Sequence, residues 1–139
     1  MKQKTMRQSK GISMVMFFIA TIYILGATAQ AAVTIHKLEI RHGHKADAAY
    51  FEITNMNDKT DALLSVESPA YGNVEIHTMS MANNVMRMRR LERVELPINE
   101  KVIFKRMGLH LMLFDPTDNK DMTFTFRFEH TEPVNVQLK

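Results

Sequence analysis

Apolar and polar residues alternate with a period of two along most of this chain, which is the pattern of half-buried β-strands. The clearest stretch is 122–128, where Met122 and three phenylalanines fall on one face and polar or charged residues fall on the other. The same pattern predicts eight further strands, at 33–40, 48–54, 61–67, 73–79, 84–90, 100–105, 108–114 and 134–138. The alternation breaks between His36 and Leu38, which predicts a β-bulge there.

Turn-forming residues separate these segments, and no stretch carries a helical apolar stripe longer than two turns. The turns are predicted at Asn57-Asp58, Pro69 to Gly72, Asn83-Asn84, Pro97 to Asn99, Asp115 to Asp118 and Glu132-Pro133. Eight or nine short strands in one domain indicate an all-β antiparallel sandwich or barrel with Greek-key connections. We expect its core to hold Ile35, either Tyr50 or Phe51, Leu64, Val66, Val74, Ile76, Val102, Phe104, Leu111, Phe124, Phe126 and Val136.

The N-terminal segment has the layout of a secretory signal peptide, with basic residues, an apolar run from 12 to 25 and small residues after it. Cleavage after Ala29 and cleavage after Ala31 fit about equally well. The apolar run is shorter than the roughly 20 residues of a membrane-spanning helix, and no Cys follows it to carry a lipoprotein anchor. We therefore expect a signal peptide at 1–29 and one exported, periplasmic domain at 30–139, without stable membrane insertion after cleavage.

The formal net charge of +3 belongs to the leader, because Lys2, Lys4, Arg7 and Lys10 precede the first acidic residue, Glu39. Without residues 1–29 the chain keeps 18 − 4 = 14 basic and 15 acidic residues, a net charge of −1. This balance argues against nucleic acid as a partner.

Histidine and methionine gather in one half of the domain. The chain contains 12 Met and no Cys, so a soft metal site would have to use thioether and imidazole ligands. Three short groups stand out: His77 to Met81, Met86 to Met88, and His110 to Met112. In a strand, spacing of two places both side chains on one face. Two imidazoles with thioethers favour Cu(I), whereas Zn²⁺ prefers thiolate or carboxylate with histidine.

The spacing of four of these residues resembles the H-x10-M-x21-H-x-M signature of the periplasmic copper chaperone family PCu(A)C. The four are His77, Met88, His110 and Met112. Further segments resemble the family in the same order: Ala48 to Phe51, Thr54-Asn55, Ser68-Pro69, Val74 to His77, Val85 to Met88 and Gly108 to Met112.

The resemblance implies a cupredoxin-like β-barrel that binds one Cu(I) near its surface through these four residues. Met79 and Met86 are auxiliary candidates as ligands. The resemblance also implies delivery of copper towards the Cu(A) centre of cytochrome c oxidase, with an oxidase subunit or a thioredoxin-like copper protein as partner. Leu38 to Lys45 departs from the family pattern, which commonly has a Trp and a Pro-Gly pair there, and the chain lacks the His- and Met-rich tail of some members.

Other interpretations use the same residues. In the main alternative, the protein is an exported β-sandwich interaction module whose Met and His residues are incidental or absorb oxidants. His42 and His44 could bind Cu(II) adventitiously or form a plain solvated loop. The arginines at 87, 89, 90 and 93 form either a docking patch for an acidic partner or, as we favour, a solvated hairpin balanced by Glu92 and Glu95. No nucleophile or phosphate-loop motif predicts an enzyme, and a copper oxidoreductase is the least favoured hypothesis.

Overall fold

The computed structural model describes residues 32–139 of the chain. The expected signal peptide at 1–29 and its two cleavage positions lie outside the described residues. Ten strands follow one another: β1 (Val33–Arg41), β2 (Asp47–Asn55), β3 (Asp61–Glu67), β4 (Tyr71–Ala82), β5 (Val85–Leu91), β6 (Val94–Leu96), β7 (Lys101–Phe104), β8 (His110–Pro116), β9 (Thr123–Phe128) and β10 (Val134–Gln137).

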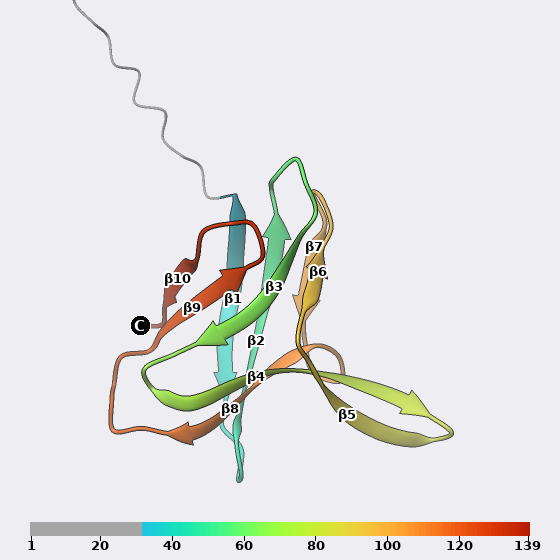
Figure 1. Ribbon diagram of the computed structural model, residues 1–139. Coiled ribbons are helices and arrows are strands. Elements are labelled where there is room, and N and C mark those ends of the chain that lie inside the picture. The colour runs from blue at the N-terminus through green and yellow to red at the C-terminus, as the bar shows by residue number, and fades with distance from the viewer. Residues whose placement is uncertain (1–31) are drawn as a thin grey trace, which may run out of the picture.

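The strands form two antiparallel sheets, so the predicted all-β fold is confirmed. The larger sheet has the order β1-β2-β8-β4-β5, with β7 also paired to β2, and the smaller has the order β10-β9-β3-β6. Several connections cross from one sheet to the other, for example those from β2 to β3 and from β8 to β9, as in a Greek-key sandwich (Figure 1). No described helix is long and apolar enough to cross a membrane.

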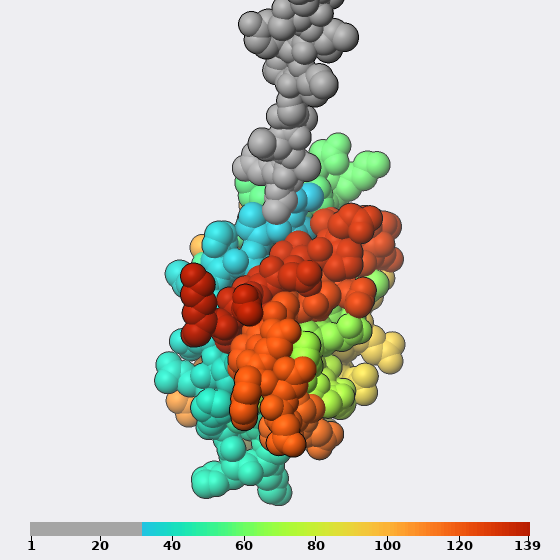
Figure 2. All heavy atoms as spheres, turned by 90° about the vertical axis from the view of Figure 1, so that its left-hand side faces the viewer, coloured from blue at the N-terminus to red at the C-terminus, as the bar shows by residue number. Residues whose placement is uncertain are grey.

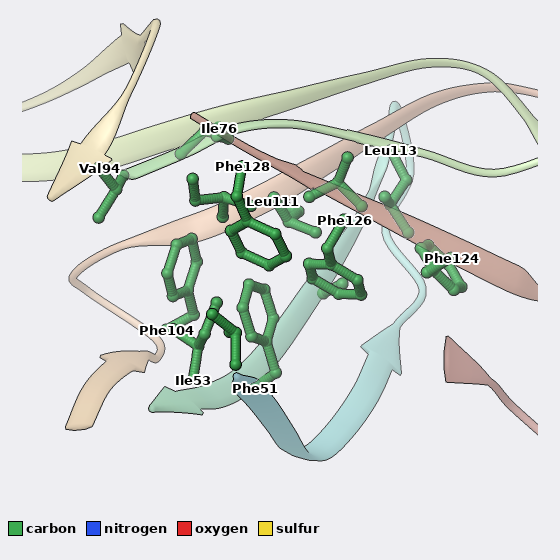
Figure 3. Close-up of a cluster of buried hydrophobic side chains, with 14 of the residues drawn as sticks. Phe51, Ile53, Ile76, Val94, Phe104, Leu111, Leu113, Phe124, Phe126 and Phe128 are labelled. Atoms are coloured by element: carbon green, nitrogen blue, oxygen red, sulfur yellow. The ribbon is translucent and has the colours of Figure 1, made fainter. Parts of the chain in front are cut away.

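The core lies between the two sheets and is rich in phenylalanine (Figure 3). Phe51 of β2 stacks on Phe104 of β7 with ring centroids 4.1 Å apart, and it meets the edge of Phe126 of β9 at 5.1 Å. The Phe51–Phe104 pair lies within the larger sheet, and the Phe51–Phe126 pair joins the larger sheet to the smaller one. Each pair adds to the stability that burial provides. Figure 2 shows the face where the C-terminal strands, in red, adjoin the start of β1, in blue.

The structure corrects one predicted core residue in β3. Leu63 is fully buried, whereas Leu64 is 40% exposed. The pairing of β3 with β9 shifts between Leu63 and Ser65, so a bulge interrupts the alternation at this point. The sequence pattern across this strand therefore predicted the wrong leucine.

Other expectations for strands and core are confirmed or refined. The predicted bulge in β1 is present, because the pairing with β2 shifts between His36 and Glu39 and Lys37 has a φ of 56°. Phe51, and not Tyr50, belongs to the buried core. The three-residue strand β6 was not predicted, since a segment this short carries little periodicity. Four predicted core residues are only partly buried against the core: Ile35, Val74, Val102 and Val136.

The hairpin of β4 and β5 extends beyond the two packed sheets (Figure 1). Its two strands pair from Ile76 with Leu91 to Ala82 with Val85, and Asn83 and Asn84 form the turn. Both asparagines have positive φ, 52° and 60°, as a type I′ turn requires. This turn follows the twist of the strands and fixes their register.

Candidate metal centre

The candidate ligands lie on three neighbouring strands of the larger sheet. His77 lies on β4 opposite His110, the first residue of β8. Met88 lies on β5 opposite Met79, which follows His77 by two residues on β4. Met112 follows His110 on β8 and pairs with Glu75. Because residues in cross-strand register share a face, the structure brings all four predicted ligands to one face of the sheet.

This face is the outer face of the larger sheet. Ile76 and Leu111 alternate with the two histidines and are buried at 3% and 0% exposure, so they point into the core. The split between apolar and His/Met positions that the sequence predicted on β4 and β8 is therefore confirmed. His110 is nevertheless only 4% exposed although it lies on the outer face. Period-two alternation does not predict that burial, because it assigns His110 to the outer face.

The two histidine rings lie close together, with centroids 6.0 Å apart and planes inclined by 45°. The Nε2–H of His77 donates to Oε2 of Glu75 at 2.8 Å. The other ring nitrogen of His77, Nδ1, is buried and has no hydrogen-bond partner among the described residues. In the neutral ring, Nδ1 then carries a free lone pair, which is what a metal ion requires.

His110 is oriented by the loop that precedes β8. Its Nδ1 lies 2.9 Å from the carbonyl oxygen of Gly108. Since a carbonyl only accepts, Nδ1 must carry the proton, and the lone pair of the neutral ring belongs to Nε2. The same carbonyl accepts from the backbone N–H of Met79 at 3.2 Å. One peptide group thus joins β4 to the β8 histidine.

The candidate thioether ligands occupy more exposed positions. Met88 is 48% exposed, while Met112 and Met79 are half-buried. The auxiliary candidate Met86 is 41% exposed and pairs with Met81 nearer the turn. The site therefore has a fixed side made by the histidines of β4 and β8, and an exposed side made by β5.

Glu75 is a charged neighbour of the candidate ligands, and the sequence did not point to it. It accepts from His77, from Asn73 at 3.0 Å and from Arg90 at 3.4 Å. The hydrogen bond from His77, then that from Asn73, holds the pKa of Glu75 below its ordinary value, and the charge of Arg90 acts in the same direction. The sequence could have indicated this contact, because a spacing of two residues on a strand places Glu75 and His77 on the same face.

The remaining candidate features lie apart from the two rings. His42 contacts Asp47 at 2.9 Å in the β1–β2 connection. Of the arginine cluster, Arg93 pairs with Glu95 and Glu129, and Arg90 pairs with Glu75. The predicted balance by Glu95 is thus confirmed, whereas the described residues show no such pairing for Glu92. Within residues 32–139 no group of three or more His, Cys, Asp or Glu side chains could hold a metal ion.

Known proteins resemble this chain in fold. A copper-bound PCuAC domain from PmoF2 has a TM-score of 0.61 at 21% identity, covering 76% of this chain and 89% of that one. The apo form of the same domain has a TM-score of 0.59 at 22% identity, covering 76% and 86% of the two chains. At this identity the likeness establishes the fold, which is that of PCuAC domains.

Sequence comparison identifies the family. The curated relative "Uncharacterized protein RP573" of Rickettsia prowazekii (strain Madrid E) is 30% identical over 101 residues, covering 66% of this chain. The chain spans 54% of the length of that relative. The family described as "Putative lipoprotein LpqE-like" matches residues 22–139, which include every strand of the sandwich. The chain therefore belongs to the LpqE-like family.

Proposed function

We propose that this protein is an exported Cu(I) carrier that binds one ion on the outer face of β4, β5 and β8 and passes it to a copper-accepting protein. The proposed ligands are His77, Met88, His110 and Met112, and we call these four residues the base site. The observation that carries the proposal is the Nδ1 of His77, which is buried and has no hydrogen-bond partner within residues 32–139. The ring that carries it lies beside the ring of His110, with centroids 6.0 Å apart. An unpaired buried polar atom costs stability, so its presence beside a second imidazole favours a ligand-binding role.

The donor set favours Cu(I) over divalent ions. Two neutral imidazoles and two thioethers are soft ligands and bring no negative charge. The nearby carboxylate of Glu75 is engaged by His77, Asn73 and Arg90. Arg90 lies opposite His77 in the register, and its cationic side chain repels a dication about twice as strongly as a monocation. Zn²⁺ therefore gains less from this site than Cu(I) does.

Transfer to another protein is favoured by the unequal exposure of the ligands. Met88 is 48% exposed on the projecting hairpin, whereas His110 is 4% exposed. An acceptor ligand can replace Met88 first while the histidines still hold the ion. Because each exchange replaces one bond by another, the ion need not pass through water.

The compartment and the acceptor are the finer parts of the proposal. Export to the periplasm is supported by the expected signal peptide and by the lipoprotein description of the family. A PCuAC domain from PmoF2 is described as copper-bound, which supports copper as the cargo here. The resemblance of the four-residue spacing to PCu(A)C proteins supports an acceptor that carries Cu(A), or a thioredoxin-like copper protein. We propose a carrier and not an enzyme.

The test is an anaerobic competition titration of residues 30–139 with Cu(I) and a chromogenic chelator. This segment contains all ten strands. We expect the native protein to retain Cu(I) against the chelator. The variants His110→Ala and Met88→Ala should each retain one equivalent of Cu(I) fewer, or hold that equivalent far more weakly. Zn²⁺ should compete poorly.

Matched controls are His130→Ala and Met56→Leu, which change an exposed histidine and an exposed methionine outside the site. Both controls should retain copper as the native protein does. Equal retention by His110→Ala, Met88→Ala and the native protein would refute the base site and leave the interaction module as the better explanation. Transfer is then tested by mixing the loaded protein with a soluble apo-Cu(A) domain and measuring copper in each after separation.

A further inference from the structure

Four methionines cover one face of the β4–β5 hairpin. Met79 pairs with Met88, and Met81 pairs with Met86 one step nearer the turn. We call these four residues the methionine face. The opposite face of the same hairpin carries no methionine and consists of Thr78, Ser80, Ala82, Val85, Arg87 and Arg89. Register therefore sorts every methionine of the hairpin onto the side that holds His77.

The register also brings the four sulfur atoms within reach of one another. The two-residue Asn83-Asn84 turn makes Ala82 and Val85 the hydrogen-bonded pair that closes the hairpin. Alternation along an antiparallel ladder then makes both methionine pairs non-hydrogen-bonded, with Cα atoms about 4.5 Å apart and side chains closer than in the other pairs. Unbranched thioether side chains adapt easily to a shared ligand.

Packing does not explain this arrangement. Met81 is 66% exposed and Met86 is 41% exposed, and neither belongs to the hydrophobic core or to the residues packed against it. The hairpin projects beyond the sandwich (Figure 1). Four thioethers, three of them exposed and that of Met79 half-buried, thus lie together on a strand pair whose register is fixed.

From this juxtaposition we propose that Met79, Met81 and Met86 form a second Cu(I) site, composed of thioethers alone, on the hairpin. This hairpin site goes beyond the base site and does not depend on its histidines. The resemblance offered Met79 and Met86 as auxiliary ligands of a single site, whereas the register places them with Met81. Three neutral thioethers suit Cu(I), and their binding releases no proton.

The two sites are adjacent. Met88 of the base site is the direct cross-strand partner of Met79. An ion on the hairpin is therefore one residue pair away from the base site, and Met88 can exchange between them. The hairpin site is the more exposed of the two and is the place where copper enters or leaves the chain.

The experiment compares Cu(I) stoichiometry in four forms of residues 30–139, measured anaerobically against the chelator. The native protein should retain two equivalents. Met81→Leu/Met86→Leu should retain one, as should His77→Ala/His110→Ala, and the variant with all four changes should retain none. Leucine preserves the volume and apolar character of methionine, and circular dichroism checks that each variant is folded. Met56→Leu, another exposed methionine, is the matched control and should retain two.

The outcomes separate the two proposals. Retention of two equivalents by Met81→Leu/Met86→Leu overturns the hairpin site, whatever the histidine variants show. Unchanged retention by His77→Ala/His110→Ala overturns the base site and leaves the hairpin site standing. A second equivalent that is held only in a dimeric fraction on gel filtration also overturns a site within one chain. Methyl NMR signals of Met81 and Met86 should shift on Cu(I) addition, and unchanged signals contradict the proposal.

Discussion

Glu75 accepts a hydrogen bond from Nε2 of His77 and so orients the ring with Nδ1 free. Removal of Glu75 should weaken copper binding at the proposed base site without removing a proposed ligand. In Glu75→Ala the Nε2–H of His77 loses the acceptor that lies 2.8 Å away. In the native protein Arg90 lies 3.4 Å from Glu75. In the variant Arg90 loses this partner and remains opposite His77 with its charge unbalanced. The ring can then rotate, and the ligand nitrogen becomes less basic.

The magnitude follows from the position of Glu75 as a hydrogen-bond partner of His77, a proposed ligand. Loss of such a partner typically lowers metal affinity by about 10- to 100-fold, or about 1.4 to 2.7 kcal/mol. Glu75→Gln keeps an amide oxygen that can accept from His77 but removes the negative charge. Because a hydrogen bond to an ionised acceptor is roughly twice as strong as a neutral one, Glu75→Gln should lose about half of that free energy, or roughly 3- to 10-fold in affinity.

The assay is the Cu(I) competition titration, run on both variants with the native protein. Glu67→Ala is the control, because it also removes a carboxylate from an ion pair, with Arg127 at 3.1 Å, but in the smaller sheet. Native affinity in Glu75→Ala, together with loss of binding in His77→Ala, would refute the reasoning. Binding equally weakened in Glu67→Ala would indicate a general effect on folding.

Two further predictions concern stability. Leu63→Ala should lower the free energy of unfolding by about 2–5 kcal/mol because it empties a fully buried position. Leu64 is exposed, so Leu64→Ala should lower the free energy of unfolding by under about 1 kcal/mol. Equal losses for the two variants in urea unfolding would contradict the β3 register. Hydrogen bonds from Lys101 and Lys37 lower the pKa of Glu52 from 4.5 to about 2, so this carboxylate stabilises the fold above about pH 4.5 and its contribution is lost as pH falls towards 2. Glu52→Gln should flatten the dependence of stability on pH in that window, and an unchanged slope in thermal unfolding would argue against the ion pairs.

Most of the strands could be predicted from the sequence because the alternation of apolar and polar residues within a strand shows which of its faces is buried. Period-two alternation marked nine of the ten strands, and the broken pattern near His36 marked a true bulge. The alternation failed at Leu64, where a bulge in the pairing with β9 reverses the expected side. It also missed β6, whose three residues pair with β3 but show too short a pattern to recognise.

The candidate site was predictable in composition but not in detail. Spacing of two placed His110 with Met112, and His77 with Met79, on one strand face each. Which strands are neighbours cannot be read from such spacing, because β8 lies between β2 and β4 in the sheet although it follows them by many residues. The 4% exposure of His110 likewise could not be predicted from the alternation, because His110 lies on the outer face of the sheet.

The sequence alone thus determined the all-β class, the apolar and His/Met faces of β4 and β8, and a candidate ligand set of imidazole and thioether, since these depend on local periodicity and residue type. Only the tertiary structure decided that His77 lies opposite His110, that Glu75 orients the first of these rings, and that the hairpin register gathers four methionines on one face. Cross-strand register is set by the turn and by burial of distant residues against one another, and no local pattern contains that information.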